Sequence, residues 1–210
     1  GTSLPQSGIY SPFKEILAGS KAYIDYMNNE LGGVTIAGKK YKVDLQAKDD
    51  AYEAAKTVAN VQSFLDQNVF GLFNVVGTKN NLAIRDAVNE ACVPNLLAAT
   101  GSPAWGNHKY PWLLGTFLVP YPDEMKALVT YLEKNKPTAT IAVLRANDDF
   151  GAAYSETLTS LVKGTKLKVV KVAQYDPETP DTKSQITTLA ATKADVLVLG
   201  ATLLACPDAL

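Results

Sequence analysis

Residues 70–105 read FGLFNVVGTKNNLAIRDAVNEACVPNLLAATGSPAW, and this stretch decides the fold. Phe70–Val76 is a short apolar run, which predicts a strand buried on both faces. Gly77-Thr78 breaks that run. Apolar residues then recur at the spacing of one helix face, at Ile84, Ala87, Val88 and Ala91. Pro94 ends this helix, and residues 95–98 form the next strand.

The stretch therefore predicts strand, turn, helix, strand and turn. Polar turns, Gly77-Thr78 and Ala99–Ser102, follow two strands that run parallel, so both turns leave the same edge of one sheet. Ligands of open α/β sheets bind at that edge. We expect the two turns to form half of a site that clamps a small molecule.

The same alternation of strand and helix extends back to the first residue. A first strand is expected to end near Pro5. Apolar and polar residues alternate over Tyr41–Ala47, which predicts a strand with one face exposed to solvent. The inner stripe of a first helix consists of Phe13, Ile16, Leu17, Ser20, Ile24 and Met27, and that of a second helix of Ala54, Val58, Val61 and Leu65. This order predicts an α/β fold in which helices cover both faces of a parallel sheet.

A second α/β lobe follows a proline-rich connection. Pro120-Tyr121-Pro122 predicts a stiff extended link that excludes helix, with Asp123 as the N-cap of the next helix. The expected strands lie at 141–144, 166–175 and 196–199, with helices between them and one opening at Leu203. The predicted domains are an N-terminal lobe over 1–117, a crossover over 118–122 and an incomplete C-terminal lobe over 123–210. Because a parallel sheet needs both faces covered, we expect the natural chain to continue past Leu210.

Composition narrows the class of protein. Of the 210 residues, 47% are hydrophobic and 20% are charged, and the formal net charge is −1, which is typical of an ordinary globular protein. This charge balance argues against a surface for nucleic acid or an anionic membrane. No apolar run approaches the roughly 20 residues of a membrane helix. The abrupt start at Gly1 indicates a mature or trimmed chain whose signal peptide has been removed.

The residues that common catalytic and metal sites require are scarce. The single histidine, His108, lies in a loop of turn composition, where we expect a surface residue, and there is no GxSxG elbow or phosphate-binding loop. Cys92 and Cys206 are too few for a zinc site; we expect buried thiols, or a partner for Cys206 beyond residue 210. Asp49-Asp50 and Asp148-Asp149 are interpreted as solvated caps rather than metal-binding pairs. We predict no catalytic residue, metal or cofactor.

The remaining chemistry favours recognition. Thr78 at a helix N-terminus offers a hydroxyl beside free backbone N–H groups, which suits an anion such as a carboxylate; the alternative is a plain threonine N-cap. The second turn offers the Ala99 carbonyl and the hydroxyls of Thr100 and Ser102 to an ammonium or hydroxyl group. The alternative for this turn is a loop that satisfies its own hydrogen bonds.

Several segments together resemble a known family. They are Leu4–Gly8 (LPQSG), Asn28–Gly33 (NNELGG), Asp49-Asp50, Leu97–Pro103 (LAATGSP) and Asp149-Phe150-Gly151. In this order they are similar to type I extracellular solute-binding proteins of ABC importers, in the leucine/isoleucine/valine-binding-like class. The resemblance covers the whole chain and implies a Venus-flytrap fold: two α/β lobes joined by three crossovers, with ligand in the cleft.

The resemblance also implies ligand contacts. The hydroxyl that holds a ligand carboxylate falls on Thr78, a backbone carbonyl contact falls on Ala99, and a second hydroxyl contact falls near Thr100 or Gly101. The aromatic residue of the first turn falls near Phe13, with Tyr10 close by. In the second lobe, the closing aromatic residue falls on Phe150 and a late contact on Thr202.

This chain departs from the family pattern in ways that affect its ligand. Phe150 and Thr202 stand where tyrosines are common, Thr100-Gly101 displaces a threonine, and the usual acidic contact with the ligand ammonium would lie beyond Leu210. The ligand therefore need not be a branched-chain amino acid. Aromatic side chains that suit a flat or apolar body are Phe13, Phe150, Tyr10, Trp105 and Tyr121.

The resemblance implies a monomeric periplasmic or cell-surface protein, free or lipid-anchored, that captures a small carboxylate-bearing molecule. The molecule would be an amino acid or another small acid or amide, and an ABC importer permease would receive it. Closure would use a hinge at Phe117, Pro120 and Pro122. The alternative is a ligand-sensing domain of a receptor or regulator on the same fold. An α/β enzyme is a third hypothesis, and it would need catalytic groups from the missing segment.

Overall fold

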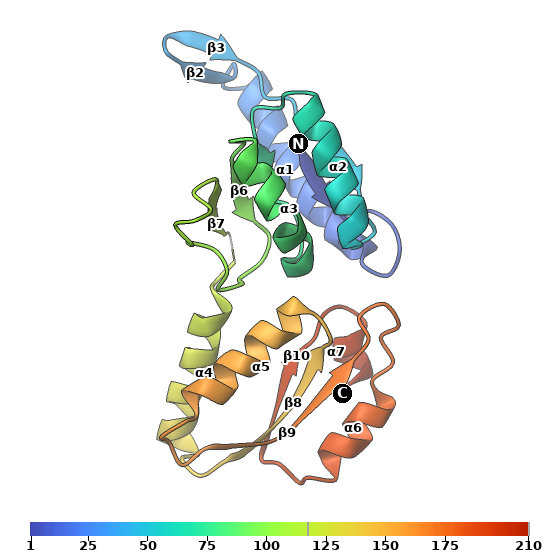
Figure 1. Cartoon of the computed structure of the whole chain (residues 1–210), viewed down its shortest axis with the longest axis vertical. Coiled ribbons are helices and arrows are strands. Elements are labelled where there is room, and N and C mark those ends of the chain that lie inside the picture. The colour runs from blue at the N-terminus through green and yellow to red at the C-terminus, as the bar shows by residue number, and fades with distance from the viewer. Residues whose placement is uncertain (117, 210) are drawn as a thin grey trace. The chain divides into compact units, whose positions relative to one another are not determined.

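The computed structural model describes residues 1–116 and 118–209, and the chain divides into two compact units (Figure 1). Unit 1 comprises Gly1–Ala99 with Asn107–Gly115. Unit 2 comprises Thr100–Gly106 with Thr116–Leu210, of which residues 117 and 210 lie outside the description. The lobe boundaries predicted from the sequence stay predictions.

Unit 1 alternates short strands with helices. Its elements are β1 (Thr2–Leu4), a 3₁₀ turn η1 (Ser11–Phe13), α1 (Lys14–Asn29), β2 (Val34–Ile36), β3 (Lys39–Tyr41), β4 (Ala47–Asp49), α2 (Ala54–Asp66), β5 (Leu72–Phe73), α3 (Thr78–Glu90), β6 (Asn95–Ala98) and β7 (Leu113–Thr116). β1 pairs with β4 and β5 with β6, both in parallel, whereas β2 and β3 form an antiparallel hairpin.

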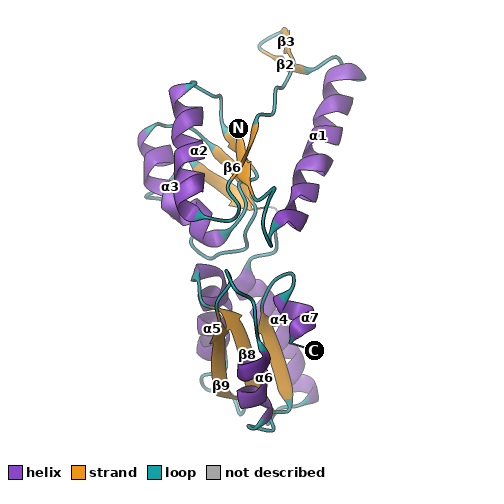
Figure 2. Cartoon of the chain, turned by 90° about the vertical axis from the view of Figure 1, so that its right-hand side faces the viewer, coloured by secondary structure: helices purple, strands orange, loops and turns teal. Residues whose placement is uncertain are grey.

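The strands of unit 1 lie between helix α1 and the helix pair α2–α3 (Figure 2). The backbone N–H groups of Phe73 and Val76 donate to the carbonyls of Gly1 and Ser3, so β5 runs beside β1. Figure 2 shows α2 and α3 on one side of these strands and α1 on the other. The α2–α3 side carries a buried core of Val61, Phe64, Leu72, Val75, Ile84 and Val88, all at most 1% exposed.

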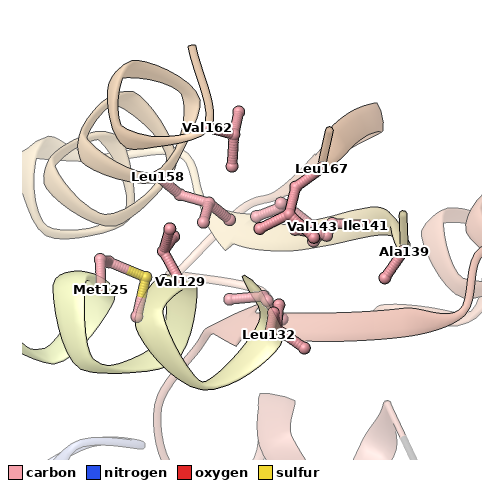
Figure 3. Packing of buried hydrophobic residues seen from close by; sticks show 10 residues of the cluster. Met125, Val129, Leu132, Ala139, Ile141, Val143, Leu158, Val162 and Leu167 are labelled. Atoms are coloured by element: carbon pink, nitrogen blue, oxygen red, sulfur yellow. The ribbon is translucent and has the colours of Figure 1, made fainter. Parts of the chain in front are cut away.

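Unit 2 has a three-stranded parallel sheet of order β10-β8-β9. Its elements are α4 (Tyr121–Asn135), β8 (Thr140–Ala146), α5 (Asp149–Leu161), β9 (Lys168–Tyr175), α6 (Lys183–Ala190), β10 (Val196–Gly200) and α7 (Ala205–Asp208). Alternate residues of β8 face opposite cores, as the period of a strand requires. Ile141 and Val143 pack with Leu158 and the inner face of α4 (Figure 3), whereas Ala142 and Leu144 pack with residues of α6 and α7.

The predicted α/β class with parallel sheets and helices is therefore confirmed. The predicted strand over 95–98 matches β6. No helix of the described chain has both the length and the apolar composition to span a bilayer.

The strand predicted over Phe70–Val76 is wrong in its extent. β5 covers only Leu72–Phe73, because Asn74 adopts a positive φ of 57° and interrupts it. Phe70 is 87% exposed rather than buried, whereas Val75 and Val76 are buried, and Val76 resumes pairing with Ala99 in a parallel bridge.

The strand predicted over Tyr41–Ala47 is also wrong in its middle. Tyr41 ends β3 and Ala47 begins β4, and residues 42–46 are in neither. At Val43 the backbone N–H and carbonyl bond to the side-chain amide of Asn28, at 2.9 and 2.8 Å, instead of to a strand. An alternation of apolar and polar residues indicates that one side of a segment is buried. It does not show that a neighbouring strand is present to form the hydrogen bonds of a β-sheet.

Two helix predictions need correction. The buried face of α2 is Thr57, Val61 and Phe64, while Val58 is 42% exposed. Helix α4 begins at Tyr121, with Pro120 as N-cap and Pro122 in the first turn, so the proline pair does not exclude helix and Asp123 is not the cap. A proline in the first turn forfeits only an N–H that has no helical partner there.

Candidate functional site

The Gly77-Thr78 turn connects β5 to α3. Thr78 is the first residue of α3, and the N-cap is Gly77, which has no side chain to cap with. The interpretation of Thr78 as a plain N-cap is therefore wrong. Thr78 is 1% exposed. The first N–H groups of a helix lack helical partners, and the helix dipole places partial positive charge there, so an anion is favoured beside Thr78.

Ala99, the first residue of the second predicted turn, lies beside the Gly77-Thr78 turn, as the strand order predicted. The Gly77 N–H donates to the Ala99 carbonyl at 3.3 Å, just after the parallel bridge between Val76 and Ala99. This carbonyl is thus already bonded once, and its second lone pair is the one that a ligand ammonium would use.

A stack of aromatic rings accompanies the Gly77-Thr78 turn in unit 1. The Tyr10 ring lies 4.2 Å from that of Tyr52 and 6.2 Å from that of Phe13, measured between centroids. Lys79 Nζ lies 5.0 Å from the Tyr52 ring centroid. The structure thus links the predicted residues Tyr10 and Phe13 to the turn through Tyr52. Sequence reasoning missed Tyr52, because its place depends on a positive φ of 66° in an irregular loop.

Asp49 organises the loop before this aromatic stack. Its Oδ1 accepts the backbone N–H groups of Gln6, Ser7 and Ala51, at 2.7, 3.3 and 2.9 Å. Desolvation acts to raise the pKa of Asp49, but hydrogen bonds from the Ser7 hydroxyl and from these N–H groups lower it to about 2. The neighbouring Asp50 is 0% exposed, so the interpretation of both as solvated caps is wrong for Asp50.

Four predicted residues meet in unit 2. Thr100 Oγ1 donates to Tyr121 Oη at 3.4 Å, and the Tyr121 N–H donates to the Gly101 carbonyl at 2.7 Å. The Tyr121 ring meets that of Phe150 edge-on at 5.5 Å. A Cβ on Gly101 would lie 2.6 Å from the Tyr121 ring, so only glycine permits this approach. Thr100 Oγ1 also accepts the Ser102 N–H at 3.1 Å, as the self-satisfied loop required.

Tyr154 and Glu124 extend this group, and sequence reasoning missed both as site residues. The Tyr154 ring lies 4.5 Å from Tyr121 and 5.3 Å from Phe150, and its hydroxyl donates to Glu124 Oε2. Burial and this hydrogen bond raise the pKa of Tyr154. Tyr154 lies one helical turn after Phe150, so i,i+4 spacing was the signal that could have found it.

The other predicted residues have separate surroundings. The Thr202 N–H donates to Tyr175 Oη at 3.3 Å, and burial raises the pKa of that phenol. The buried indole Nε1 of Trp105 has no hydrogen-bond partner among the described residues. Phe117, a predicted hinge residue, lies outside the described residues, and the hinge role of Pro120 and Pro122 stays a prediction.

Unit 1 also contains a cavity. It measures about 640 Å³ in unit 1, and its wall includes Ile24 and Met27 of α1 and Leu72 and Phe73 of β5. No predicted ligand contact lines it. Of the stripe predicted for α1, only Leu17 is buried, because the helix borders this cavity.

The described residues contain few groups that could bind a metal or act as catalysts. No three His, Cys, Asp or Glu side chains cluster as metal ligands within residues 1–116 and 118–209. Asp148 caps α5 by accepting the Gly151 N–H at 2.9 Å, and His108 is exposed, as predicted. Cys92 and Cys206 are free thiols, and Cys92 is exposed rather than buried.

The sequence of this chain matches a known protein family. A family model described as periplasmic binding protein matches residues 1–207. A search of curated proteins gave no match.

Solved structures share the fold. A substrate-binding periplasmic protein from Ralstonia solanacearum superposes with a TM-score of 0.82 at 28% identity, over 96% of this chain and 56% of that one. A periplasmic binding protein from Burkholderia mallei gives 0.83 at 18% identity, over 100% and 56%. A branched-chain amino acid ABC transporter protein from Thermus thermophilus with bound valine gives 0.78 at 18%, over 99% and 53%. The chain thus spans about half the length of these relatives.

Proposed function

This chain belongs to the periplasmic binding protein family, and we propose that it captures a small carboxylate-bearing molecule outside the cytoplasm and delivers it to the permease of an ABC importer. The proposed ligand is an amino acid or another small acid or amide, bound without chemical change. The valine held by the Thermus thermophilus relative supports an amino acid as the first candidate.

One observation carries this proposal: Gly77, the N-cap residue immediately before Thr78, donates its N–H to the Ala99 carbonyl at the start of α3. A carboxylate at Thr78 would meet a hydroxyl, the first N–H groups of a helix and its positive dipole end. An ammonium on the same small molecule would meet the Ala99 carbonyl. A zwitterionic amino acid has both groups a few bonds apart, so the pair of turns suits it better than a simple anion does.

The remaining proposed contacts supply shape. Tyr10 and Phe13 offer aromatic surface in unit 1, and Tyr121 and Phe150 do so in unit 2. Aromatic surface suits an apolar or flat ligand body. The full set of proposed contacts is Tyr10, Phe13, Thr78, Ala99, Thr100, Gly101, Trp105, Tyr121, Phe150 and Thr202.

The test begins with the ligand. Native mass spectrometry of the purified full-length protein should find a co-purified small molecule. Calorimetric titration should then rank L-valine, L-leucine, L-phenylalanine and benzoate. If none of the four binds and nothing co-purifies, the proposed ligand class is wrong.

Thr78→Ala then tests the site. Loss of one hydrogen bond to a charged group should weaken binding of the best of these four compounds by about 1.5–3 kcal/mol, without unfolding the protein. The matched control is Thr130→Ala, since the exposed Thr130 hydroxyl donates only to the Lys126 carbonyl of its own helix. Equal affinities in Thr78→Ala and the control would remove Thr78 from the site.

A further inference from the structure

A buried carboxylate lies close to the Gly77-Thr78 turn. Asp50 is 0% exposed, and its Oδ2 accepts the hydroxyls of Ser3 at 2.7 Å and Thr57 at 3.0 Å. Its Oδ1 accepts the Tyr52 N–H at 2.9 Å. These donors come from β1, from α2 and from the loop after β4, so one side chain ties three segments together.

The hydrogen bonds continue from Asp50 to the first turn of α3. Asn80 Nδ2 donates to Thr57 Oγ1 at 2.6 Å, and Asn80 is 0% exposed. A Cβ on Gly77 would lie 2.7 Å from Asn80 Oδ1 and 2.7 Å from the Tyr52 ring. The backbone at Gly77 is therefore packed against the two residues that the network holds, Asn80 and Tyr52.

The negative charge gives the chain of hydrogen bonds its direction. An ionised carboxylate only accepts, so Thr57 must donate to Asp50 and keep its lone pairs for Asn80. The Thr57 hydroxyl has a second acceptor within reach, the Glu53 carbonyl at 3.2 Å.

A buried carboxylate held by neutral donors is costly. Among the described residues, no basic nitrogen lies within 4.0 Å of Asp50; the ion pair there is Lys56 with Glu53. Burial disfavours the charged form, and an apolar cluster would fill the same volume at lower cost. What the carboxylate supplies instead is a fixed position for the residues around the turn.

We propose that Asp50, acting through Thr57 and Asn80, is a positioning residue that holds the Gly77-Thr78 turn in the geometry that receives the anionic group of the ligand. The part concerning the ligand rests on the proposed function. The fixed geometry of the turn does not, and it is measurable without any ligand.

The first measurement is amide hydrogen exchange, by NMR, in the full-length protein without ligand. The reporters are the N–H groups of Gly77 and Asn81, which donate to the Ala99 and Gly77 carbonyls. Thr57→Val keeps the side-chain shape but removes the hydroxyl, and should speed exchange at both reporters about tenfold, the factor for one lost buried hydrogen bond. Thr57→Ser keeps the hydroxyl and should leave exchange unchanged.

A merely structural role gives a different result. Ala91, at the other end of α3, donates to Ala87 and serves as the internal reference. Faster exchange at Gly77 and Asn81 but not at Ala91 supports positioning. Unchanged exchange at the reporters, or an equal rise at Ala91, overturns it. Asp50→Asn should act like Thr57→Val; if it does not fold, Thr57→Val alone decides.

The second measurement is a double-mutant cycle with L-leucine as the probe. Thr57→Val should weaken L-leucine binding about tenfold in the natural protein and have little effect when Thr78 is already alanine. Equal weakening in both backgrounds overturns the action through Thr78. If L-leucine does not bind, the cycle uses whichever of L-valine, L-phenylalanine and benzoate binds; if none of them binds, the exchange result stands by itself and the proposed ligand class is wrong.

Discussion

Gly77→Ala is the substitution whose cost the structure defines best. Gly77 has φ 101° and ψ 143°, a backbone conformation that residues with a Cβ rarely adopt. The added methyl would lie 2.7 Å from Asn80 Oδ1, 2.7 Å from Tyr52 Cε2 and 3.1 Å from Tyr52 Cζ. Both neighbours are buried, so neither moves freely.

Two terms add in this substitution. The unfavourable φ costs about 1–3 kcal/mol. Forcing a methyl into a packed site costs about 1–3 kcal/mol more. We therefore expect Gly77→Ala to lower the free energy of unfolding by about 2–6 kcal/mol, which is a large share of the roughly 5–15 kcal/mol of a typical domain.

Two other glycines in unit 1 separate the terms. Gly8 has φ 72° with nothing within 4 Å of a Cβ, so Gly8→Ala carries the backbone cost alone. Gly19 lies inside α1 with open space around it, and Gly19→Ala should stabilise by about 0.5–1 kcal/mol. Urea unfolding of the three variants measures the differences. If Gly77→Ala costs no more than Gly8→Ala, the close packing described around the turn is wrong.

Two further predictions concern ionisable groups. The folded-state pKa of Asp49 is depressed to about 2, so its hydrogen bonds contribute stability that is complete above the unfolded pKa of about 3.9 and is lost as pH falls toward 2. Asp49→Asn should flatten the stability profile in that window, as urea midpoints at each pH would show; an unchanged slope would contradict the loop contacts. Tyr154→Phe removes the phenol that donates to Glu124 and should cost about 1–3 kcal/mol. Because the pKa of Tyr154 is raised, this phenol does not contribute to the ultraviolet titration near pH 10. The folded variant and the natural protein should therefore show the same number of phenols ionising near pH 10, and one fewer in the variant would refute the environment described for Tyr154.

The sequence predicted best where an element and its partners both lie within residues 1–209. Strands β6 and β8 have apolar sequences, and each pairs in parallel with a neighbouring strand. Both lie close to their predicted positions. Prediction failed where pairing was missing. Residues 42–46 have alternating side chains, yet a side-chain amide takes the place of a strand at Val43.

The candidate site was predictable in its backbone and less so in its side chains. Strand order alone placed the Gly77-Thr78 turn beside Ala99. Tyr52 and Asp50 could not be predicted as neighbours of that turn, because both lie in a loop outside any helix or strand. The position of Tyr52 depends on its positive φ, and the burial of Asp50 follows no helix or strand periodicity. Proline at position 122 misled because its effect depends on whether it falls in the first turn of a helix or later.

The pairing of Asn28 with Val43 has a consequence for self-association. An exposed strand edge offers unpaired N–H and carbonyl groups on which another chain can add as a strand, which is a route to aggregation. At Val43 one amide side chain fills both groups, so an incoming chain would have to displace two hydrogen bonds before making its own. A single asparagine on α1 thereby occupies two backbone groups that an added strand would need, where other proteins use a charge or a proline to discourage such pairing.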